Sequence, residues 1–112
     1  MENTIKGNYK MRVFGLLKGL PYGNCNEDIA EYAEIKNEIP KEKIIKYIES
    51  DAVEKWYTSA NSRDVFTGEK LTAGKFVDGD FVFPMEFLHY YKNYDIGIPY
   101  DYEEYLKGKI DY

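Results

Sequence analysis

The single histidine of the chain, His89, is the residue whose type most readily supports catalysis. A Ser-His or Cys-His dyad would have to use it, and a zinc site could take only one imidazole ligand. Glu86 lies one helical turn earlier, but carboxylates at this spacing are common on helix surfaces. We expect His89 to lie at the edge of the core, and we keep as an alternative a small hydrolase or transferase that uses His89 with a carboxylate.

The single cysteine, Cys25, is the second candidate nucleophile. It lies in a loop sequence, Gly23 to Glu27, where a thiol could be exposed, but no lysine or arginine lies within several residues to lower its pKa. We therefore expect no nucleophilic role. One cysteine also excludes an intrachain disulfide and a thiolate metal cluster, which favours a reducing compartment.

Two acidic motifs could serve a metal or acid–base chemistry. Asp78 and Asp80 flank Gly79, where turn geometry alone explains their presence. Arg63 beside Asp64 combines one of only two arginines with an acid, and we expect a structural ion pair that ties this loop to a sheet. Turn geometry and ion pairing explain these acids without a metal, so we predict no metal site. The glycine spacing also matches no phosphate-binding loop, so we predict no cofactor.

Tyrosine is the main compositional outlier, with 12 of 112 residues. Six tyrosines alternate with acids near the C-terminus: Tyr90, Tyr91, Tyr94, Tyr100, Tyr102 and Tyr105, among Asp95, Asp101, Glu103 and Glu104. Exposed tyrosine surrounded by carboxylates is typical of a protein-binding surface directed at a basic partner. The predicted partner-binding residues are Tyr100, Asp101, Tyr102, Glu103, Glu104 and Tyr105, with at least two of the three carboxylates facing solvent. The alternative is that tyrosine simply fills a small core.

The elements that must position these residues are clearest after Lys75. Asp78-Gly79 between two apolar runs predicts a hairpin with a type I′ turn, in which Val77 pairs with Asp80 and Phe76 with Phe81. Phe76, Phe81 and Phe83 then share the core face, while Val77 and Val82 share the other. Pro84 fits the first position of a three-turn helix. Asp101 with Glu104, and Tyr100 with Tyr105, predict a capped second helix from Tyr102.

The rest of the chain gives weaker signals. Residues 1–8 are expected to be loose, and the apolar spacing from Tyr9 to Leu20 predicts a helix, with a strand over Lys10 to Phe14 as the alternative. Residues 27–36 fit helix and strand equally. We predict a helix over residues 38–50, a strand over residues 53–59, and short strands within residues 65–71 around a turn at Thr67-Gly68-Glu69.

Together these elements predict one α+β domain over residues 1–112: a small antiparallel sheet with the Asp-Gly hairpin, packed against three or four helices. The net charge of −5 disfavours binding to nucleic acid, because that affinity comes largely from cations neutralising phosphates. The longest apolar runs are far short of the roughly 20 residues that a membrane span needs. We therefore expect a cytoplasmic protein that does not bind membranes.

Several of these motifs resemble a large group of small bacterial proteins. The likeness covers roughly residues 39–106, and it rests on Phe66-Thr67-Gly68-Glu69, Asp78-Gly79-Asp80-Phe81-Val82-Phe83-Pro84, Tyr90, Tyr94 and Ile98-Pro99. Proteins of the group typically read T-D-G-x-[YF]-x-W-P-x-x-L-x-Y-Y there, whereas this chain has Val77, Phe83 and His89 at the Thr, Trp and first Tyr positions. The resemblance implies a compact α+β fold and genes often found among toxin-immunity and other accessory loci, and it implies no catalytic residue.

The function that these observations favour is non-enzymatic protein binding, by a small acidic inhibitor or immunity-type protein that occludes a basic surface on its partner. A structural subunit that homodimerises through an aromatic surface is a further alternative. We accordingly expect the protein to be a monomer or a homodimer.

Overall fold

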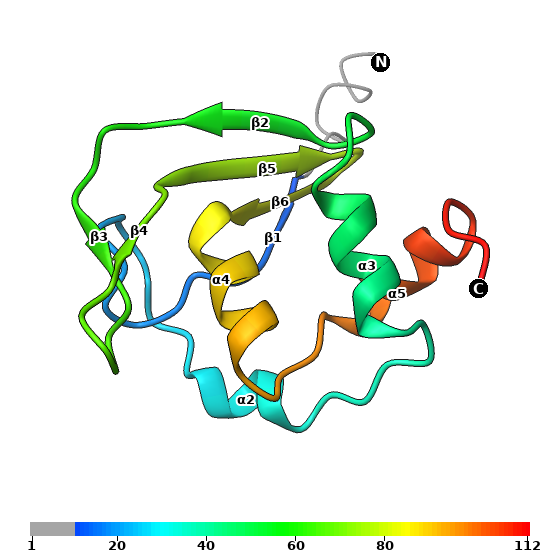
Figure 1. The fold of residues 1–112 in the computed structure, drawn as a ribbon, viewed down its shortest axis with the longest axis horizontal. Coiled ribbons are helices and arrows are strands. Elements are labelled where there is room, and N and C mark those ends of the chain that lie inside the picture. Colours follow the sequence, from blue (N-terminus) through cyan, green and yellow to red (C-terminus); the bar gives the residue numbers. More distant parts are fainter. Residues whose placement is uncertain (1–10) are drawn as a thin grey trace, which may run out of the picture.

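The centre of the protein is a four-stranded sheet with the spatial order β1-β6-β5-β2 (Figure 1). The structure, a computed structural model, describes residues 11–112. The sheet contains β1 (Arg12–Val13), β6 (Phe81–Pro84), β5 (Gly74–Asp78) and β2 (Glu54–Tyr57), and a separate ribbon pairs β3 (Ser62–Arg63) with β4 (Lys70–Leu71). The helices of this range are α2 (Ile29–Ala33), α3 (Lys41–Ile48), α4 (Met85–Asn93) and α5 (Tyr100–Lys107). The predicted α+β class is confirmed, although β1 runs parallel to β6, so the sheet is mixed.

The hairpin of β5 and β6 forms as predicted, but its register is shifted. Asp78 pairs with Phe81 and Val77 with Val82, so the two-residue loop is Gly79-Asp80 and not Asp78-Gly79. Gly79 has a φ of +61°, whereas Asp80 is not left-handed, which fits a type II′ turn and not the predicted type I′. Each residue of β5 therefore pairs with a residue of β6 two positions later than predicted. Because side chains in a strand alternate between the two faces, a shift of two positions leaves every side chain on its predicted face.

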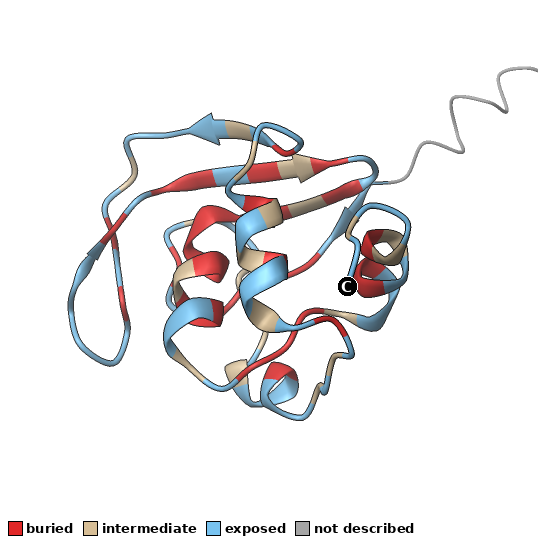
Figure 2. Ribbon diagram, turned by 45° about the vertical axis from the view of Figure 1, so that its right-hand side comes forward, coloured by how far each residue is buried: buried red, intermediate tan, exposed pale blue. Residues whose placement is uncertain are grey.

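The core lies on the face of the sheet that α3, α4 and α5 cover (Figures 1 and 2). Phe76, Phe81 and Phe83 point into it and are buried, while alternate residues of β5 are more exposed. The Phe83 ring stacks on Phe14 with centroids 4.6 Å apart, and the Phe81 ring meets Tyr102 of α5 at 4.9 Å. Each fully buried ring of this kind contributes about 1.5–3 kcal/mol. These contacts attach the helices to the sheet.

The predicted helix over Tyr9 to Leu20 is wrong for the residues described. Arg12 and Val13 form β1, close to the alternative strand over Lys10 to Phe14; Tyr9, Lys10 and the stretch of residues 1–8 lie outside the described residues. Gly15 explains the difference, because its φ of +79° is incompatible with an α-helix. A Cβ at this position would also lie 2.9 Å from the Phe87 ring. Tight packing against α4 therefore takes precedence over helical spacing.

The other predicted elements are close to those observed. Helix α3 and strand β2 lie within their predicted ranges, and residues 27–36 resolve into the short α2. The short strands predicted within residues 65–71 lie farther apart in the sequence than expected. They are β3 and β4, and the loop between them comprises residues 64–69. Helix α4 begins one residue after Pro84, which still belongs to β6.

Helix α5 begins at Tyr100 and not at Tyr102, so the predicted capping box is wrong. Pro99 occupies the cap position, and the Asp101 carboxylate accepts from the neighbouring Tyr102 N–H, at 2.8 Å, where a capping box needs the N–H of Glu104. Because the helix starts two residues early, the spacing of Tyr100 and Tyr105 is no longer that of a hydrophobic staple. None of the helices within residues 11–112 is long and apolar enough to cross a membrane.

Candidate functional site

A buried carboxylate, Asp64, organises the loop between β3 and β4. Its side chain is 1% exposed. Oδ1 accepts hydrogen bonds from the backbone N–H groups of Phe66 (2.7 Å) and Thr67 (3.1 Å). Oδ2 accepts from His89 Nε2 (2.7 Å) and from the Tyr94 hydroxyl (2.9 Å). Four donors therefore satisfy one carboxylate and link the loop to α4 and the residue that follows it.

These donors keep Asp64 ionised. Burial by itself raises the pKa of this carboxyl, but the hydrogen bonds, that from His89 foremost, outweigh burial and lower the pKa to about 2. The His89 side chain is 17% exposed, and its Nδ1 faces the Asn93 amide nitrogen at 3.4 Å. A neutral ring protonated at Nε2 satisfies both contacts, since Nε2–H donates to Asp64 and Nδ1 accepts from Asn93.

The backbone of the same loop is also held at several points. Gly68 N–H donates to the Asp64 carbonyl (2.8 Å), and Val65 N–H donates to the Tyr90 hydroxyl (2.9 Å). Arg63 Nη1 donates to the Gly68 carbonyl (3.0 Å). The predicted ion pair between Arg63 and Asp64 is therefore wrong, because Asp64 pairs with His89 while Arg63 closes the loop.

The loop holds two apolar side chains in solvent. Phe66 is 60% exposed and Val65 is 51% exposed. The inner edge of the Phe66 ring rests against Tyr94, with centroids 5.4 Å apart, and against Tyr90 at 6.3 Å. These contacts orient the ring, yet most of it stays uncovered, so burial in this chain does not account for its presence.

Two shallow apolar hollows flank Phe66. One of about 140 Å³ extends toward Leu17 and Ile29, and one of about 300 Å³ extends along α2 to Ile96. Acidic residues line their rims, Glu27 and Asp28 beside the first and Asp95 beside the second, and Lys18 is the cation beside the first. We call this region the Phe66 surface; it comprises Asp28, Ile29, Ala33, Val65, Phe66, Tyr94 and Asp95.

The predicted binding residues of α5 divide between surface and core. Tyr100, Asp101 and Glu104 are exposed, so the expectation that two carboxylates face solvent is confirmed. Glu103 is buried, and it accepts from the N–H groups of Glu38 (2.6 Å) and Ile39 (3.0 Å) and from the Asn37 amide (3.0 Å). Tyr102 is buried and Tyr105 is half-buried. Helical geometry thus removes Tyr102 and Glu103 from the predicted surface.

Tyr102 and Tyr105 instead serve a second buried carboxylate, Asp78. Oδ2 accepts from the Tyr102 hydroxyl (2.9 Å), and Oδ1 accepts from Tyr105 (3.0 Å) and Tyr47 (3.1 Å). Burial, followed by the nearby carboxylate, raises the pKa of all three phenols, so they remain protonated donors. Asp78 therefore joins the hairpin to α3 and α5 in addition to its place beside the turn, while Asp80 is exposed.

Cys25 does not have the surroundings of an activated thiol. Burial raises the pKa of its thiol, and the carboxylates of Glu86 and Glu27 add to this effect. A low thiol pKa requires nearby positive charge, and these neighbours are negative. The expectation that Cys25 is not a nucleophile is consistent with this environment.

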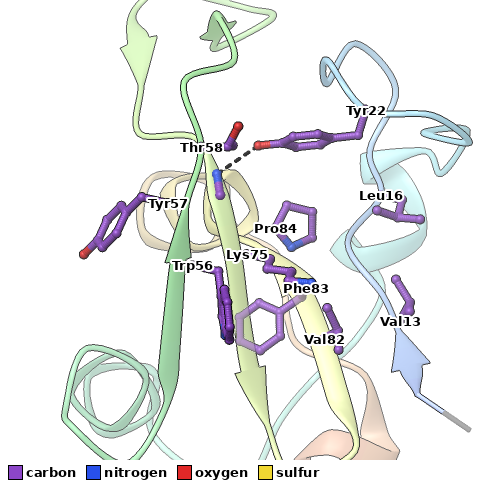
Figure 3. Close-up of a pocket in the computed structure, with 11 residues that line it drawn as sticks. Val13, Leu16, Tyr22, Trp56, Tyr57, Thr58, Lys75, Val82, Phe83 and Pro84 are labelled. Atoms are coloured by element: carbon purple, nitrogen blue, oxygen red, sulfur yellow. Dashed lines mark hydrogen bonds between the residues drawn. The ribbon is translucent and has the colours of Figure 1, made fainter.

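The face of the sheet opposite the helices carries a third feature, a groove of about 360 Å³ (Figure 3). Val13, Val82 and Pro84 form its floor and Trp56 stands at one side, 58% exposed. At one end the Tyr22 hydroxyl accepts from Gly74 N–H at 2.9 Å and donates to Glu86 at 2.8 Å. This end of the groove is therefore polar, whereas the rest is apolar.

Comparison of the chain with protein-family models, curated proteins and solved structures finds no significant match.

Two features of the site escaped the sequence analysis. His89 and Asp64 are 25 residues apart, and no local pattern connects them. The loop itself does carry a signal, because Asp64 followed by Phe66, Thr67 and Gly68 has the spacing of a turn in which an aspartate accepts backbone N–H groups. Such a turn directs the intervening side chains away from the carboxylate, which is how Phe66 comes to be exposed.

Proposed function

We propose that the protein is a non-enzymatic protein-binding module, most concretely a small acidic inhibitor that occludes a basic surface on its partner. The observation that carries this proposal is Phe66, a large apolar ring held in solvent by a loop that hydrogen bonds to Asp64 and Tyr90 keep in place. Aromatic side chains that protrude from an ordered backbone are the typical anchors of protein interfaces.

The order of the loop favours binding. Asp64 engages two backbone N–H groups of the loop and links them to His89 and Tyr94. A loop that is already fixed loses little conformational entropy when a partner covers it, so more of the contact energy remains as affinity. The two hollows beside Phe66 provide places for apolar side chains of the partner.

Charge favours a basic partner. The chain carries a net charge of −5, and exposed Asp28 and Asp95 lie at the rims of the Phe66 surface. Lys18 approaches Asp28 only to 3.9 Å, with both side chains more than half exposed, so it screens this acid weakly. Complementary fields of this kind speed association and suppress binding to acidic proteins.

The test begins with recovery of a partner by cross-linking in cells, guided by the genes that neighbour this one, followed by purification of both proteins. Titration of the purified partner then compares wild type with Phe66→Ser, which we expect to weaken binding by at least about tenfold. Tyr112→Ser removes an aromatic ring of similar exposure, 52%, and serves as the matched control. Tyr100→Ser tests the exposed part of the predicted α5 surface in the same assay.

An inhibitor must also stop the activity of its partner at one-to-one stoichiometry. Loss of binding in Tyr100→Ser but not in Phe66→Ser would move the interface to α5. Equal affinity and equal inhibition for all variants would show that neither the Phe66 surface nor α5 forms the interface, and would refute the proposal.

A second candidate function, a small hydrolase or transferase, is favoured by the His89–Asp64 pair. A buried ionised carboxylate 2.7 Å from an imidazole orients the ring for proton transfer. His89 also lines a surface hollow of about 520 Å³ whose other charged residues are Lys55, Lys70, Lys92, Glu49 and Glu69. Lys92 pairs with Glu49 at 2.9 Å and Lys55 donates to backbone carbonyls, so Lys70 is the lysine left to contact a substrate beside the ring.

His89→Gln separates the two candidates, because the Gln amide can still donate to Asp64 but cannot act as a base. We expect this variant to retain binding and one-to-one inhibition. If His89→Gln lost activity by about a hundredfold or more with an unchanged melting temperature, His89 would be catalytic. Turnover of many partner molecules by each molecule of the wild-type protein would then establish the enzyme instead.

A further inference from the structure

The outer edge of β2 offers a row of backbone hydrogen-bonding groups with a definite pattern. Thr58 N–H donates to the Ala73 carbonyl directly opposite, so this pair is a hydrogen-bonded pair of the antiparallel ladder. Because such pairs alternate, Trp56 also bonds toward β5, whereas the N–H and C=O groups of Lys55 and Tyr57 point away from it. Figure 1 shows that β2 lies at the open edge of the sheet.

This edge combines features that discourage pairing with features that permit it. Strand β2 has only four residues and includes Glu54 and Lys55, which count against pairing. Strand β2 contains no proline, and its ladder with β5 runs through four successive pairs without a bulge. The charge of Lys55 is turned inward, since Nζ donates to the carbonyls of Ser50 (2.6 Å) and Val53 (3.0 Å). Trp56 and Tyr57 are 58% and 70% exposed. As far as residues 11–112 are concerned, an extended segment can therefore approach the edge without displacing a bonded backbone group.

We propose that β2 pairs antiparallel with β2 of a second copy of this chain, about a twofold axis at Trp56. In this register Lys55 lies opposite the partner's Tyr57, and the outward groups of these two residues in both copies form four hydrogen bonds. The two Trp56 side chains become a non-hydrogen-bonded pair, the arrangement that brings side chains closest, on the outer face of the sheet. The two four-stranded sheets then form one continuous sheet.

The neighbouring registers fit less well. A twofold axis at Lys55 would place two lysines directly opposite each other and would require Val53 to pair, although Val53 N–H already donates to the Ser50 carbonyl at 3.4 Å. An axis at Tyr57 would leave Lys55 to pair beyond the end of the strand, with residue 59. Registers offset by one residue would turn Trp56 toward the helix-covered face of the other copy. The axis at Trp56 uses all outward groups of both strands.

A symmetric cysteine tests the register directly. In a Cys25→Ser background, Trp56→Cys places two thiols across the twofold axis, at a Cα separation of about 4.5 Å that suits a disulfide. We expect oxidation to yield a covalent dimer much faster from Trp56→Cys than from Lys55→Cys or Tyr57→Cys. Equal or faster cross-linking at position 55 or 57 would overturn the assigned pairing.

Tyr57→Pro tests the hydrogen bonds without touching the internal ladder, because it removes an N–H that points outward. Sedimentation of the wild-type protein should show a reversible dimer whose fraction rises with concentration, and Tyr57→Pro should weaken self-association by at least about tenfold. Tyr57→Ser removes the ring but keeps the N–H, and should retain most of the dimer. A wild type that stays monomeric at the highest attainable concentration would refute the proposal, and this outcome would leave binding through Phe66 untouched.

Discussion

Asp64 and Asp78 are both buried carboxylates that accept hydrogen bonds from tyrosines, yet their other donors differ. Asp64 receives two backbone N–H groups from its own loop, one imidazole and one phenol. Asp78 receives three phenols, and these come from residues 31, 24 and 27 positions away. The first carboxylate shapes the segment to which it belongs and also links that segment to α4, whereas all the side-chain donors to the second come from distant parts of the chain.

The difference separates a local role from a global one. Loss of Asp64 should release the loop that presents Phe66, while the sheet and the helices keep their aromatic contacts. Loss of Asp78 should disconnect α3 and α5 from the hairpin, since Tyr47, Tyr102 and Tyr105 would lose a shared acceptor. Four predictions follow this contrast, in order of decreasing effect on stability.

Asp78→Ala should have the largest effect, a loss of about 3 kcal/mol or more of unfolding free energy. The variant leaves the fully buried Tyr102 hydroxyl without its acceptor, and an unpaired buried donor costs about 1–3 kcal/mol by itself. Urea unfolding followed by tryptophan fluorescence measures the change. Asp80→Ala, at the exposed neighbouring acid, should cost less than about 1 kcal/mol. Similar losses in both variants would mean that the phenol cluster contributes little.

Asp64 should make stability depend on pH in the acid range. Its pKa in the folded protein is about 2 against an ordinary value of 3.8, so its contribution is complete above pH 3.8 and disappears as the pH falls toward 2. The loss amounts to about 2 kcal/mol. Asp64→Asn should be less stable at neutral pH and should show a flatter decline between pH 4 and 2.

Part of the acid decline should persist in Asp64→Asn, because burial of Glu103 is likewise outweighed by hydrogen bonds that lower its pKa. Denaturant unfolding at a series of pH values provides the comparison. Parallel curves for wild type and Asp64→Asn would show that Asp64 is not ionised by its donors in the way the geometry indicates.

Gly79→Val should cost more than about 1 kcal/mol, because a β-branched residue resists the φ of +61°. A Cβ at this position would also lie 2.9 Å from the Tyr105 hydroxyl, one of the donors to Asp78. Gly23→Val is the matched control, since no atom lies within 4 Å of a Cβ there and its φ is not left-handed. An unchanged denaturation midpoint for Gly79→Val would contradict the observed turn.

Tyr47→Phe and Tyr94→Phe remove one hydroxyl from each cluster and should have the smallest effects, about 1 kcal/mol and less. We expect Tyr47→Phe to cost more, because Asp78 keeps only two donors whereas Asp64 keeps three. Thermal melting resolves the order of the two variants. The reverse order would indicate that the phenol of Tyr94, and not the backbone donors, carries the Asp64 site.

Much of the fold could be predicted from local patterns. The alternation of Phe76, Phe81 and Phe83 with valines identifies the core face of the hairpin even though the pairing is displaced, because two residues of shift preserve the pleat. The spacing of the isoleucines likewise identifies the buried face of α3, because one face of an amphipathic helix has to meet the core. The conformation around Gly15 could not be predicted in this way, because the backbone there packs closely against Phe87, which is distant in the sequence.

The candidate site, in contrast, could not be predicted from local patterns. Composition indicates an excess of tyrosines near carboxylates, but it cannot say which hydroxyls point inward. Helix α5 starts two residues earlier than its cap signals predict, and its packing buries Tyr102 and Glu103 while Tyr100 stays outside. The pairing of His89 with Asp64 depends on how α4 packs beside the loop that follows β3.

The sequence by itself thus determined that α3, β2 and the hairpin of β5 and β6 form, and which faces of α3 and the hairpin are apolar, because both follow from the backbone periods of short segments. Only the tertiary structure decided which carboxylates are buried, which tyrosines serve them, and that Phe66 is left in water. The physical reason is that a buried carboxylate must find donors wherever the packed chain provides them, and those donors lie as far as 31 residues away.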